Sequence, residues 1–224
     1  MLPYTPNILK FCNKVILMNL LTPITLKGNY ATLVPLSMEH CADLAHAVTD
    51  GELWKIWYAT VPSPEKVAKE IERRFSLHKQ GILLPFTVID NISQKPIGMT
   101  TYYKIDTANK RCDIGWTWYS KSFQRTAINT ECKLMLLTHA FETLHCIAVT
   151  LTANEFNLNS RRAIERLGAK LDGVLRNLRV MANGVICDYY QYSIINSEWL
   201  TVKANLNHLL ENRRPEHACS VGYL

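Results

Sequence analysis

Three strand-like segments separated by short turns occupy residues 83–120 and constrain the fold more than any other feature. The segments LLPFTVID, IGMTTYYKID and RCDIGWTWYS are rich in β-branched and aromatic residues, and the connections NISQKP and TANK are typical of turns. Strands joined by such short connections pair antiparallel with their neighbours, because parallel pairing needs a much longer crossover. The sequence therefore predicts an antiparallel meander in the middle of the chain.

Helices and further strands surround this meander. Ser37 and Pro64 are typical of helix starts and Gly81 and Gly168 of helix ends, and Ser160 is expected to cap a short helix. The other expected strands span residues 25–36, 145–153, 171–180 and 184–195, and the expected helices span residues 38–49, 65–81, 132–144, 161–169 and 197–212. This βααβββαβαββα order predicts a single α+β domain with a mixed, mostly antiparallel central sheet flanked by helices.

Composition narrows the class of protein. The chain has 224 residues, of which 48% are hydrophobic and 20% charged, as in globular proteins. Its net charge of +6 fits an anionic ligand, but the basic residues are dispersed, so direct nucleic-acid binding is not expected. The seven cysteines form no CxxC pair and no zinc-type cluster, so no metal site is expected. Their odd number and scatter indicate reduced thiols in the cytoplasm.

The two ends of the chain are expected to lie outside the folded domain. Lys10 and Lys14 interrupt the apolar N-terminal segment, so it is predicted to be neither a membrane span nor a signal peptide. We expect residues 1–17 to be a peripheral extension, or alternatively the functional chain to start at Met18. Residues 213–224 show no periodicity and are expected to be a flexible tail, which leaves residues 18–212 as the domain.

A polar segment without glycine, FQRTAINTE at residues 123–131, joins the last strand of the meander to an apolar helix. A strand, a polar loop and a helix start are the parts of a phosphate cradle, in which backbone N–H groups and the helix dipole face the anion. Ala127 can donate as glycine would if its backbone keeps a negative φ, and Asn129 tolerates a left-handed φ. The segment is compatible with such a cradle and equally with an ordinary capped helix start.

Four segments in this order resemble the GCN5-related N-acetyltransferase (GNAT) superfamily, and more narrowly its RimJ/RimL-like ribosomal-protein-acetyltransferase branch. They are IGWTWYSKSFQRTAINTE, the helix after it, NLNSRRAIERLGAKLDGVLR and CDYYQYSIINSEW, and the resemblance extends from about Leu26 to Trp199. It implies the GNAT fold, acetyl coenzyme A as the cofactor, and direct transfer of the acetyl group to a primary amine in a ternary complex. The acceptor would be a protein N-terminus or a small-molecule amine.

The resemblance also implies a cofactor site. The family's Gln/Arg-x-x-Gly-x-Gly/Ala pattern falls on the glycine-free segment, whose backbone N–H groups would bind the pyrophosphate. The residues concerned are Gln124, Arg125, Thr126, Ala127, Ile128, Asn129 and Thr130. The sheet is expected to open beside Trp116, Thr117 and Trp118, so that backbone groups of these residues pair with the pantetheine, and an N–H near Trp118 would bind the developing oxyanion.

A second pattern of the family, Asn-x-x-Ser, falls on Asn157 and Ser160. The resemblance implies that Asn157 reaches the pantetheine, whereas Ser160 caps the next helix with or without a cofactor. Arg161 and Arg162 place positive charge in the first turn of that helix, where it opposes the helix dipole. A cofactor phosphate near Arg161 would explain this placement, and an exposed surface position would explain it equally well.

The chemistry requires that the acceptor amine lose a proton, which a carboxylate can take directly or through a water. The family often has an acidic residue on the strand that here carries Asp113, which is therefore the candidate base and is otherwise an exposed side chain. The family's tyrosine that protonates the leaving thiolate matches Ile164, which cannot do so. Either Ser160, a water or a tyrosine of the last hairpin takes this role, or the thiolate leaves unassisted. These tyrosines are Tyr189, Tyr190 and Tyr192.

The acceptor is expected to bind between the loop at residues 51–62 and the last hairpin. Trp54, Trp57 and Tyr58 would form an aromatic wall for it, and Asp188 would attract a cationic amine. Trp54 and Trp57 are also spaced as core residues of a short helix.

Three functions remain open. The first is an N-acetyltransferase, monomeric or homodimeric, or a relative that uses a longer acyl chain. The second is a non-catalytic coenzyme A-binding module, suggested by the missing glycines, the missing tyrosine and the short Asp113 side chain. The third is an RNA-associated protein, since relatives act on ribosomal proteins, and absence of RNA affinity at low salt would exclude it.

Overall fold

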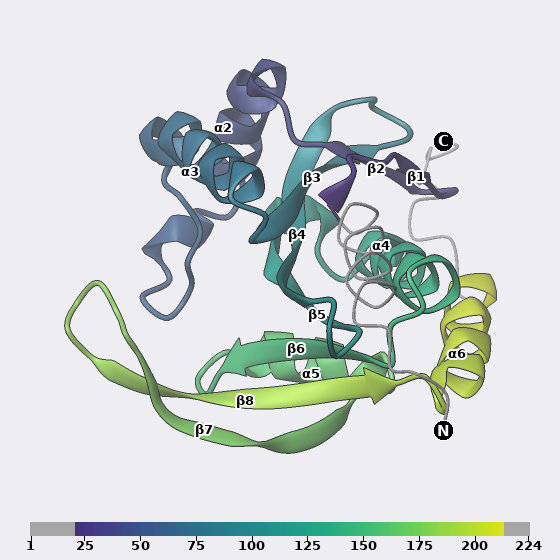
Figure 1. Cartoon of the computed structure of the whole chain (residues 1–224). Helices are drawn as coiled ribbons and strands as arrows, with labels where there is room; N and C mark the ends of the chain where they lie inside the picture. The colour runs from purple at the N-terminus through teal and green to yellow at the C-terminus, as the bar shows by residue number, and fades with distance from the viewer. Residues whose placement is uncertain (1–20, 213–224) are drawn as a thin grey trace, which may run out of the picture.

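The structure, a computed structural model, describes residues 21–212, which form one mixed sheet flanked by helices (Figure 1). The strands are β1 (Leu26–Lys27), β2 (Ala31–Pro35), β3 (Leu83–Asp90), β4 (Pro96–Asp106), β5 (Arg111–Tyr119), β6 (Ala148–Asn154), β7 (Lys170–Val180) and β8 (Ile186–Ile195). Their order in the sheet is β1-β2-β3-β4-β5-β6-β8-β7. The β5–β6 pair is parallel and the other neighbouring pairs of described strands are antiparallel, which confirms the predicted class. The expected extension and tail lie outside the described residues.

The predicted meander is confirmed, because β3, β4 and β5 pair antiparallel in chain order. The single strand predicted over residues 25–36 is instead two short strands, β1 and β2, that pair with each other. A turn separates them, in which the Gly28 N–H donates to the Ala31 carbonyl at 2.9 Å. Glycine and asparagine favour turns, and the sequence Gly28-Asn29 accounts for the break.

The described residues form five α-helices, and most of the predicted helix signals are confirmed. The helices are α2 (Cys41–Thr49), α3 (Val67–Lys79), α4 (Ala127–Thr138), α5 (Leu158–Arg166) and α6 (Trp199–Glu211). Ser37 and Pro64 each start a 3-10 turn that leads into α2 or α3. Gly81 and Gly168 follow α3 and α5 with φ of +75° and +96°, a conformation that glycine adopts at low cost.

The predicted cap of α5 is wrong, because Asn157 rather than Ser160 caps this helix. The Asn157 side chain accepts a hydrogen bond from the Ser160 N–H at 3.0 Å, and Ser160 lies in the first helical turn. Both residue types are good N-caps, so the backbone decides, and Asn157 has the non-helical φ of −83° and ψ of 67°. The helix therefore begins at Leu158 instead of Arg161.

Helices cover both faces of the central strands. In Figure 1, α2 and α3 lie together on one side of β3 and β4, whereas α4 and α6 lie on the other side. The largest apolar core joins α4 and α6 to the sheet, and a second core joins α2 and α3 to Met99 of β4 and Trp118 of β5. The long β7–β8 hairpin extends from the other end of the sheet below the loop that follows α2 (Figure 1).

A buried carboxylate ties α4 to the turn between β1 and β2. Glu131 accepts hydrogen bonds from the N–H groups of Asn29, Tyr30 and Ala31 at 2.6, 2.7 and 2.9 Å. Gly28 leaves room for this carboxylate, since a Cβ at that position would lie 2.4 Å from Glu131 Cδ. The N-terminal half of α4 is thus fixed to the edge of the sheet.

Replacing Glu131 with glutamine is expected to lower the free energy of unfolding by about 2 kcal/mol, because the amide NH2 would face N–H donors that lose their acceptor. Urea denaturation would measure the change, with the exposed Glu211→Gln on α6 as the matched control. A Glu131→Gln variant as stable as this control would show that the three hydrogen bonds contribute little.

The cysteines within residues 21–212 are free thiols. Cys112, Cys132, Cys146 and Cys187 are buried and pack as small apolar side chains. None of the helices in the same part of the chain is long and apolar enough to cross a membrane.

Candidate active site

The central sheet opens between β5 and β6. These strands pair in parallel only from Arg111 to Asp113 of β5, which face Ala148 to Thr150 of β6. Beyond this point β5 pairs with β4, and β6 pairs with β8, so the facing edges of β5 and β6 separate. The opening expected beside residues 116–118 is present at that position.

A β-bulge at Trp116 lies at the edge of this opening. Trp116 has a φ of +48°, and the β4–β5 register shifts between Met99 and Thr101. Further along β5, the Ser120 N–H donates to the Ile97 carbonyl of β4 at 2.8 Å. Because backbone groups alternate in direction along a strand, those of Trp118 also point to β4.

The backbone groups of Thr117 and Tyr119 consequently point toward the opening. The Tyr119 carbonyl on this side accepts a hydrogen bond from Gln124 Nε2 at 3.1 Å. The N–H groups of Thr117 and Tyr119 are therefore the β5 donors that face the separated edge of β6. From the sequence, the pantetheine contacts were expected at Trp116, Thr117 and Trp118 and the oxyanion donor near Trp118. The bulge at Trp116, which sets the direction of these backbone groups, is invisible in the sequence.

The glycine-free segment ends at the start of α4. Thr126 is the N-cap, and its Oγ1 donates to the Phe123 carbonyl at 2.7 Å and accepts from the Ile128 N–H at 3.4 Å. Ala127 is the first helical residue, which confirms its expected negative φ. The left-handed φ of the segment occurs at Arg125, +63°, and not at Asn129, which lies inside the helix. N–H groups in a first helical turn lack intrahelical partners and suit an anion.

Two buried side-chain atoms of β6 beside the opening have no hydrogen-bond partner among the described residues. They are Thr152 Oγ1 and Asn154 Nδ2. Buried polar groups are nearly always paired, so these atoms indicate a place for a polar ligand. A pantetheine arm, with its amide donors and acceptors, fits this requirement. Thr152 and Asn154 were not singled out from the sequence, although their alternation along β6 places them on one face with Thr150.

Asp113 lies where β5 and β6 begin to separate. Its residue exposure is 7%, and Lys104 Nζ lies 3.3 Å from Asp113 Oδ2. Burial raises the pKa of this carboxyl above its ordinary value, and the charge of Lys104 opposes part of the rise. Tyr103 faces Asp113 across the β4–β5 pair. The expectation of a merely exposed Asp113 is therefore wrong.

Lys133 lies on the α4 side of the bulge. Its Nζ donates to Thr117 Oγ1 at 3.0 Å, and its residue exposure is 5%. Burial lowers the pKa of this amine to about 8. A lysine in the apolar face of α4 gave no sequence signal, because its position is defined by the packing of α4 on β5.

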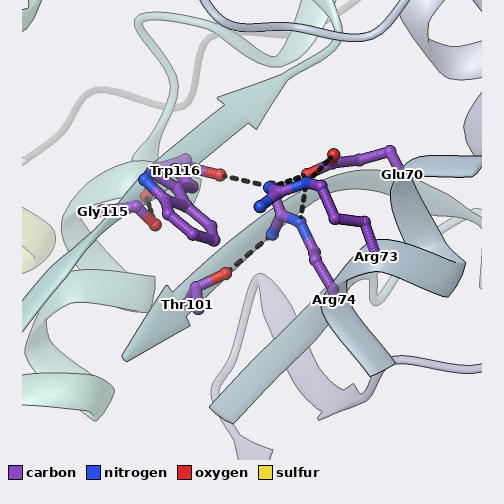
Figure 2. Close-up of polar contacts among 7 residues, drawn as sticks. Glu70, Arg73, Arg74, Thr101, Gly115 and Trp116 are labelled. Atoms are coloured by element: carbon purple, nitrogen blue, oxygen red, sulfur yellow. Dashed lines mark hydrogen bonds and ion pairs between the residues drawn. The ribbon is translucent and has the colours of Figure 1, made fainter. Parts of the chain in front are cut away.

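A buried arginine holds the bulge from the other face of the sheet. Arg74 of α3 is 1% exposed, and its three nitrogens donate to Glu70 Oε1 at 2.8 Å, Thr101 Oγ1 at 2.7 Å and the Trp116 carbonyl at 3.1 Å. Figure 2 shows this guanidinium between Glu70 and Trp116, with Arg73 beside it. Arg74 is thus a positioning residue for β5.

The α5 side of the site places its arginine against aromatic rings. Arg161 Cζ lies 3.6 Å from the centroid of the Tyr190 ring, and Arg161 Nε donates to Tyr192 Oη at 3.3 Å. Tyr192 Oη donates to Glu165 Oε1 at 2.8 Å. Ile164 is buried in the main core. Of the tyrosines considered as proton donors, Tyr192 is therefore already engaged with α5.

The structure brings together part of the expected acceptor wall. The ring of Trp57 lies 5.5 Å from that of Tyr58 and 5.3 Å from that of Phe156, which follows β6 and was not singled out from the sequence. Trp54 packs against the core of α2 and α3. Asp188 forms an ion pair with Arg176 at 3.0 Å and accepts from the Asn177 N–H at 2.7 Å, so it also holds the β7–β8 hairpin.

A mixed sheet that opens between two parallel strands, beside a helix N-terminus suited to an anion, is the arrangement of the acyltransferases with the GNAT fold. A family model described as the acetyltransferase (GNAT) domain matches residues 31–170. The chain belongs to this GNAT acetyltransferase family, whose cofactor is acetyl coenzyme A.

Known proteins similar to this chain agree with the family. "Putative ribosomal N-acetyltransferase YdaF" of Bacillus subtilis is 33% identical over 102 residues, which span 46% of this chain and 55% of that protein, so the match extends over about half of the relative. A GCN5-related N-acetyltransferase structure from Brucella melitensis has a TM-score of 0.74 and 26% identity, covering 90% of both chains. Mycobacterium smegmatis RimJ in complex with CoA-disulfide has the same fold, with a TM-score of 0.72 and 18% identity over 84% of this chain and 96% of that one.

Proposed function

We propose that this protein transfers an acetyl group from acetyl coenzyme A to a primary amine by direct attack in a ternary complex. The observation that carries the proposal is the opening between β5 and β6, which contains buried unpaired polar atoms and ends near the start of α4. A sheet with no ligand to bind would keep these two strand edges paired, because unpaired buried polar groups cost free energy.

Different residues at the opening bind different parts of the cofactor. The N–H groups at the start of α4, from Thr126 to Thr130, bind the pyrophosphate, and the backbone of Thr117 and Tyr119 pairs with the pantetheine. Thr152 and Asn154 supply side-chain partners from β6. When bound, acetyl coenzyme A supplies a thioester whose acetyl group an amine can take with loss of a thiolate.

Asp113 is the proposed proton acceptor for the attacking amine. Its raised pKa makes it a stronger base than an exposed aspartate, and it lies where the strands begin to separate. Arg74 does not touch the reacting atoms, but it fixes the Trp116 carbonyl and thus the direction of the Thr117 N–H. The aromatic group of Trp57, Tyr58 and Phe156 would contact the acceptor.

The proposed acceptor is a protein N-terminus. The relative YdaF is named as a ribosomal N-acetyltransferase, and this name supports a protein amine in the present case. We further propose that the protein acts without direct nucleic-acid contact.

Release of free thiol from acetyl coenzyme A, measured with peptides and small amines, tests the activity. We expect continuous release that requires both the protein and an amine, with acetylated acceptor formed in equal amount. Cofactor binding without thiol release from any amine would overturn the proposal in favour of a non-catalytic coenzyme A-binding protein.

Replacing Ala127 with proline tests the cradle without glycine. Proline is tolerated at the first helical position, and Thr126 has the extended backbone that a residue before proline requires, with φ of −93° and ψ of −176°. The change deletes one N–H and leaves the helix. We expect the dissociation constant for coenzyme A, measured by calorimetry, to rise about tenfold, as for loss of one charge-assisted hydrogen bond.

The matched control is Ala127→Ser, which keeps the N–H and should bind coenzyme A as the wild type does. Equal affinity in the proline variant, with an unchanged melting temperature, would show that the pyrophosphate does not use this group.

A further inference from the structure

A cavity lined by three arginines lies on the α3 side of the β5 bulge. Its volume is about 290 Å³, close to the lower end of the range of small-molecule sites, roughly 300 to 1,000 Å³. The lining residues are Thr60, Glu70, Arg73, Arg74, Trp116 and Arg179. They come from the loop after α2, from α3, from β5 and from β7, so segments distant in the sequence meet there.

The charges in this cavity do not balance. Glu70 is its one carboxylate among the described lining residues, and Arg73 binds it through two hydrogen bonds of 2.7 and 2.8 Å while Arg74 donates to it at 2.8 Å. Arg179 has no ion pair within residues 21–212. Three guanidinium groups thus face one carboxylate, and the lining carries an excess of two positive charges.

The arginines have different tasks. All three nitrogens of the Arg74 guanidinium have protein partners, as Figure 2 shows, so this side chain belongs to the framework. Arg73 lies over the indole of Trp116, with its Cζ 4.6 Å from the ring centroid, and its side chain is 47% exposed. Arg179, an exposed residue of β7, also lines the cavity. Glu70 occupies Nε and Nη2 of Arg73, so Arg179 and the Nη1 group of Arg73 are the cationic donors available to a ligand.

The cavity adjoins the proposed reaction centre. Its Trp116 wall stacks on Tyr103, with centroids 5.3 Å apart and planes inclined by 19°, and Tyr103 faces Asp113 across the β4–β5 pair. The same Trp116 precedes Thr117, whose N–H faces the cofactor opening. A ligand group bound between Arg73 and Arg179 would thus lie close to both Asp113 and the bulge.

We propose that this cavity binds a carboxylate of the acceptor, so that the substrate is an amine that also carries an acidic group. This inference rests on the proposed acetyl transfer. The fork geometry of arginine suits a carboxylate, and the Trp116 face supplies an apolar wall for the adjoining carbons. The acidic group belongs either to a residue near a peptide N-terminus or to a free amino acid, and the experiment separates these sources.

Thiol release is measured with matched pairs of acceptors that differ in one charge. One pair is a peptide with aspartate or asparagine at its second position, and the other is a free amino acid or its amide. For the wild type we expect kcat/KM to be about 10- to 100-fold higher for the acidic member of one pair, as for a charge-assisted contact. The pair with the larger ratio identifies the source.

Arg179→Gln is expected to reduce that ratio to about threefold or less, since it removes a ligand-facing cation from an exposed strand where folding is not at risk. The matched control is Lys95→Gln, which removes an exposed positive charge outside the cavity and should keep the ratio. Equal rates for the two members of both pairs in the wild type, or an unchanged ratio in Arg179→Gln, would overturn the inference while leaving acetyl transfer intact.

A binding measurement separates failure of the inference from failure of the proposed function. The N-acetylated aspartate peptide cannot accept an acetyl group, and calorimetry compares its binding with that of the asparagine form. Tighter binding of the aspartate form that is lost in Arg179→Gln would support the cavity even if no amine released thiol. Equal binding of both peptide forms to the wild type, together with equal binding of the N-acetylated amino acid and its amide, would contradict it.

Discussion

Replacing Glu70 with glutamine is expected to lower the free energy of unfolding by about 3 to 5 kcal/mol, the largest effect of any single change considered for this fold. Glu70 is the carboxylate partner of Arg74, which is 1% exposed, and of Arg73 beside it. A glutamine side chain cannot balance the charge of a guanidinium that is almost completely buried. The loss would therefore exceed that of an ordinary surface ion pair, about 0 to 1 kcal/mol.

Urea denaturation of three variants measures this effect. Glu72→Gln, an exposed position on the same helix, is the matched control and should remain near the wild type. The double variant Glu70→Leu with Arg74→Met should recover part of the loss, because it removes the buried charge together with its partner. A Glu70→Gln variant within about 1 kcal/mol of the wild type would show that Arg74 is not held in the way the structure indicates.

The pH dependence of stability provides a second measure of the same pair. Burial raises the pKa of Glu70, but the hydrogen bonds and charges of Arg73 and Arg74 together hold it below its ordinary value of 4.5. A lowered folded-state pKa contributes stability that is present above the unfolded-state pKa and is lost as the pH falls through the folded-state value. The wild type should lose this contribution below about pH 4.5, and Glu70→Gln should not.

Replacing Gly98 with alanine is expected to displace β5 at the cofactor opening. A Cβ on Gly98 would lie 2.1 Å from the Trp118 carbonyl oxygen and 3.0 Å from both the Trp118 carbonyl carbon and the Tyr119 Cα. These are backbone atoms, so no side-chain rotation can relieve the contact. We expect a loss of about 3 kcal/mol in the free energy of unfolding, the upper end of the usual cost of overpacking.

The same change should weaken cofactor binding, because Thr117 and Tyr119 would move with the strand. We expect the dissociation constant for coenzyme A to rise about tenfold or more, the effect of losing one charge-assisted or two neutral hydrogen bonds. Gly173→Ala is the matched control, since no atom lies within 4 Å of a Cβ at that position. Wild-type stability and affinity in Gly98→Ala would contradict both the close approach of β4 to β5 and the role of that segment.

Much of the fold follows from local signals in the sequence. The predicted helix boundaries are confirmed, because the residues that mark them have backbone preferences that depend on few neighbours. These residues are Ser37 and Pro64 at helix starts and Gly81 and Gly168 at helix ends. Asn157 and Ser160 show the limit of such signals, because two good caps stand three residues apart and tertiary packing selects the first. The split between β1 and β2 combines the local turn signal Gly28-Asn29 with a long-range contact, since Glu131 from a distant helix holds the turn.

The parts of the site that escaped sequence analysis depend on long-range contacts. Nothing in the sequence distinguishes Arg74 from its exposed neighbour Arg73. Only the packing of α3 on β4 and β5 buries Arg74. Trp116 has a left-handed φ, which is unusual for a bulky residue, and no glycine at this position signals it in the sequence. The family resemblance predicted that the sheet would open near this point. Only the structure shows that Arg74 holds the bulge.

The central claim is that acetyl coenzyme A binds along the opening between β5 and β6 with its pyrophosphate on a helix start that has no glycine. A crystal structure of the protein with coenzyme A tests it most directly. We expect the pyrophosphate oxygens within hydrogen-bond distance of N–H groups at residues 126–130, including that of Ala127, and the pantetheine between Thr117 on β5 and Thr152 on β6. A pyrophosphate bound elsewhere, or an Ala127 N–H turned away from it toward the protein core, would contradict the claim.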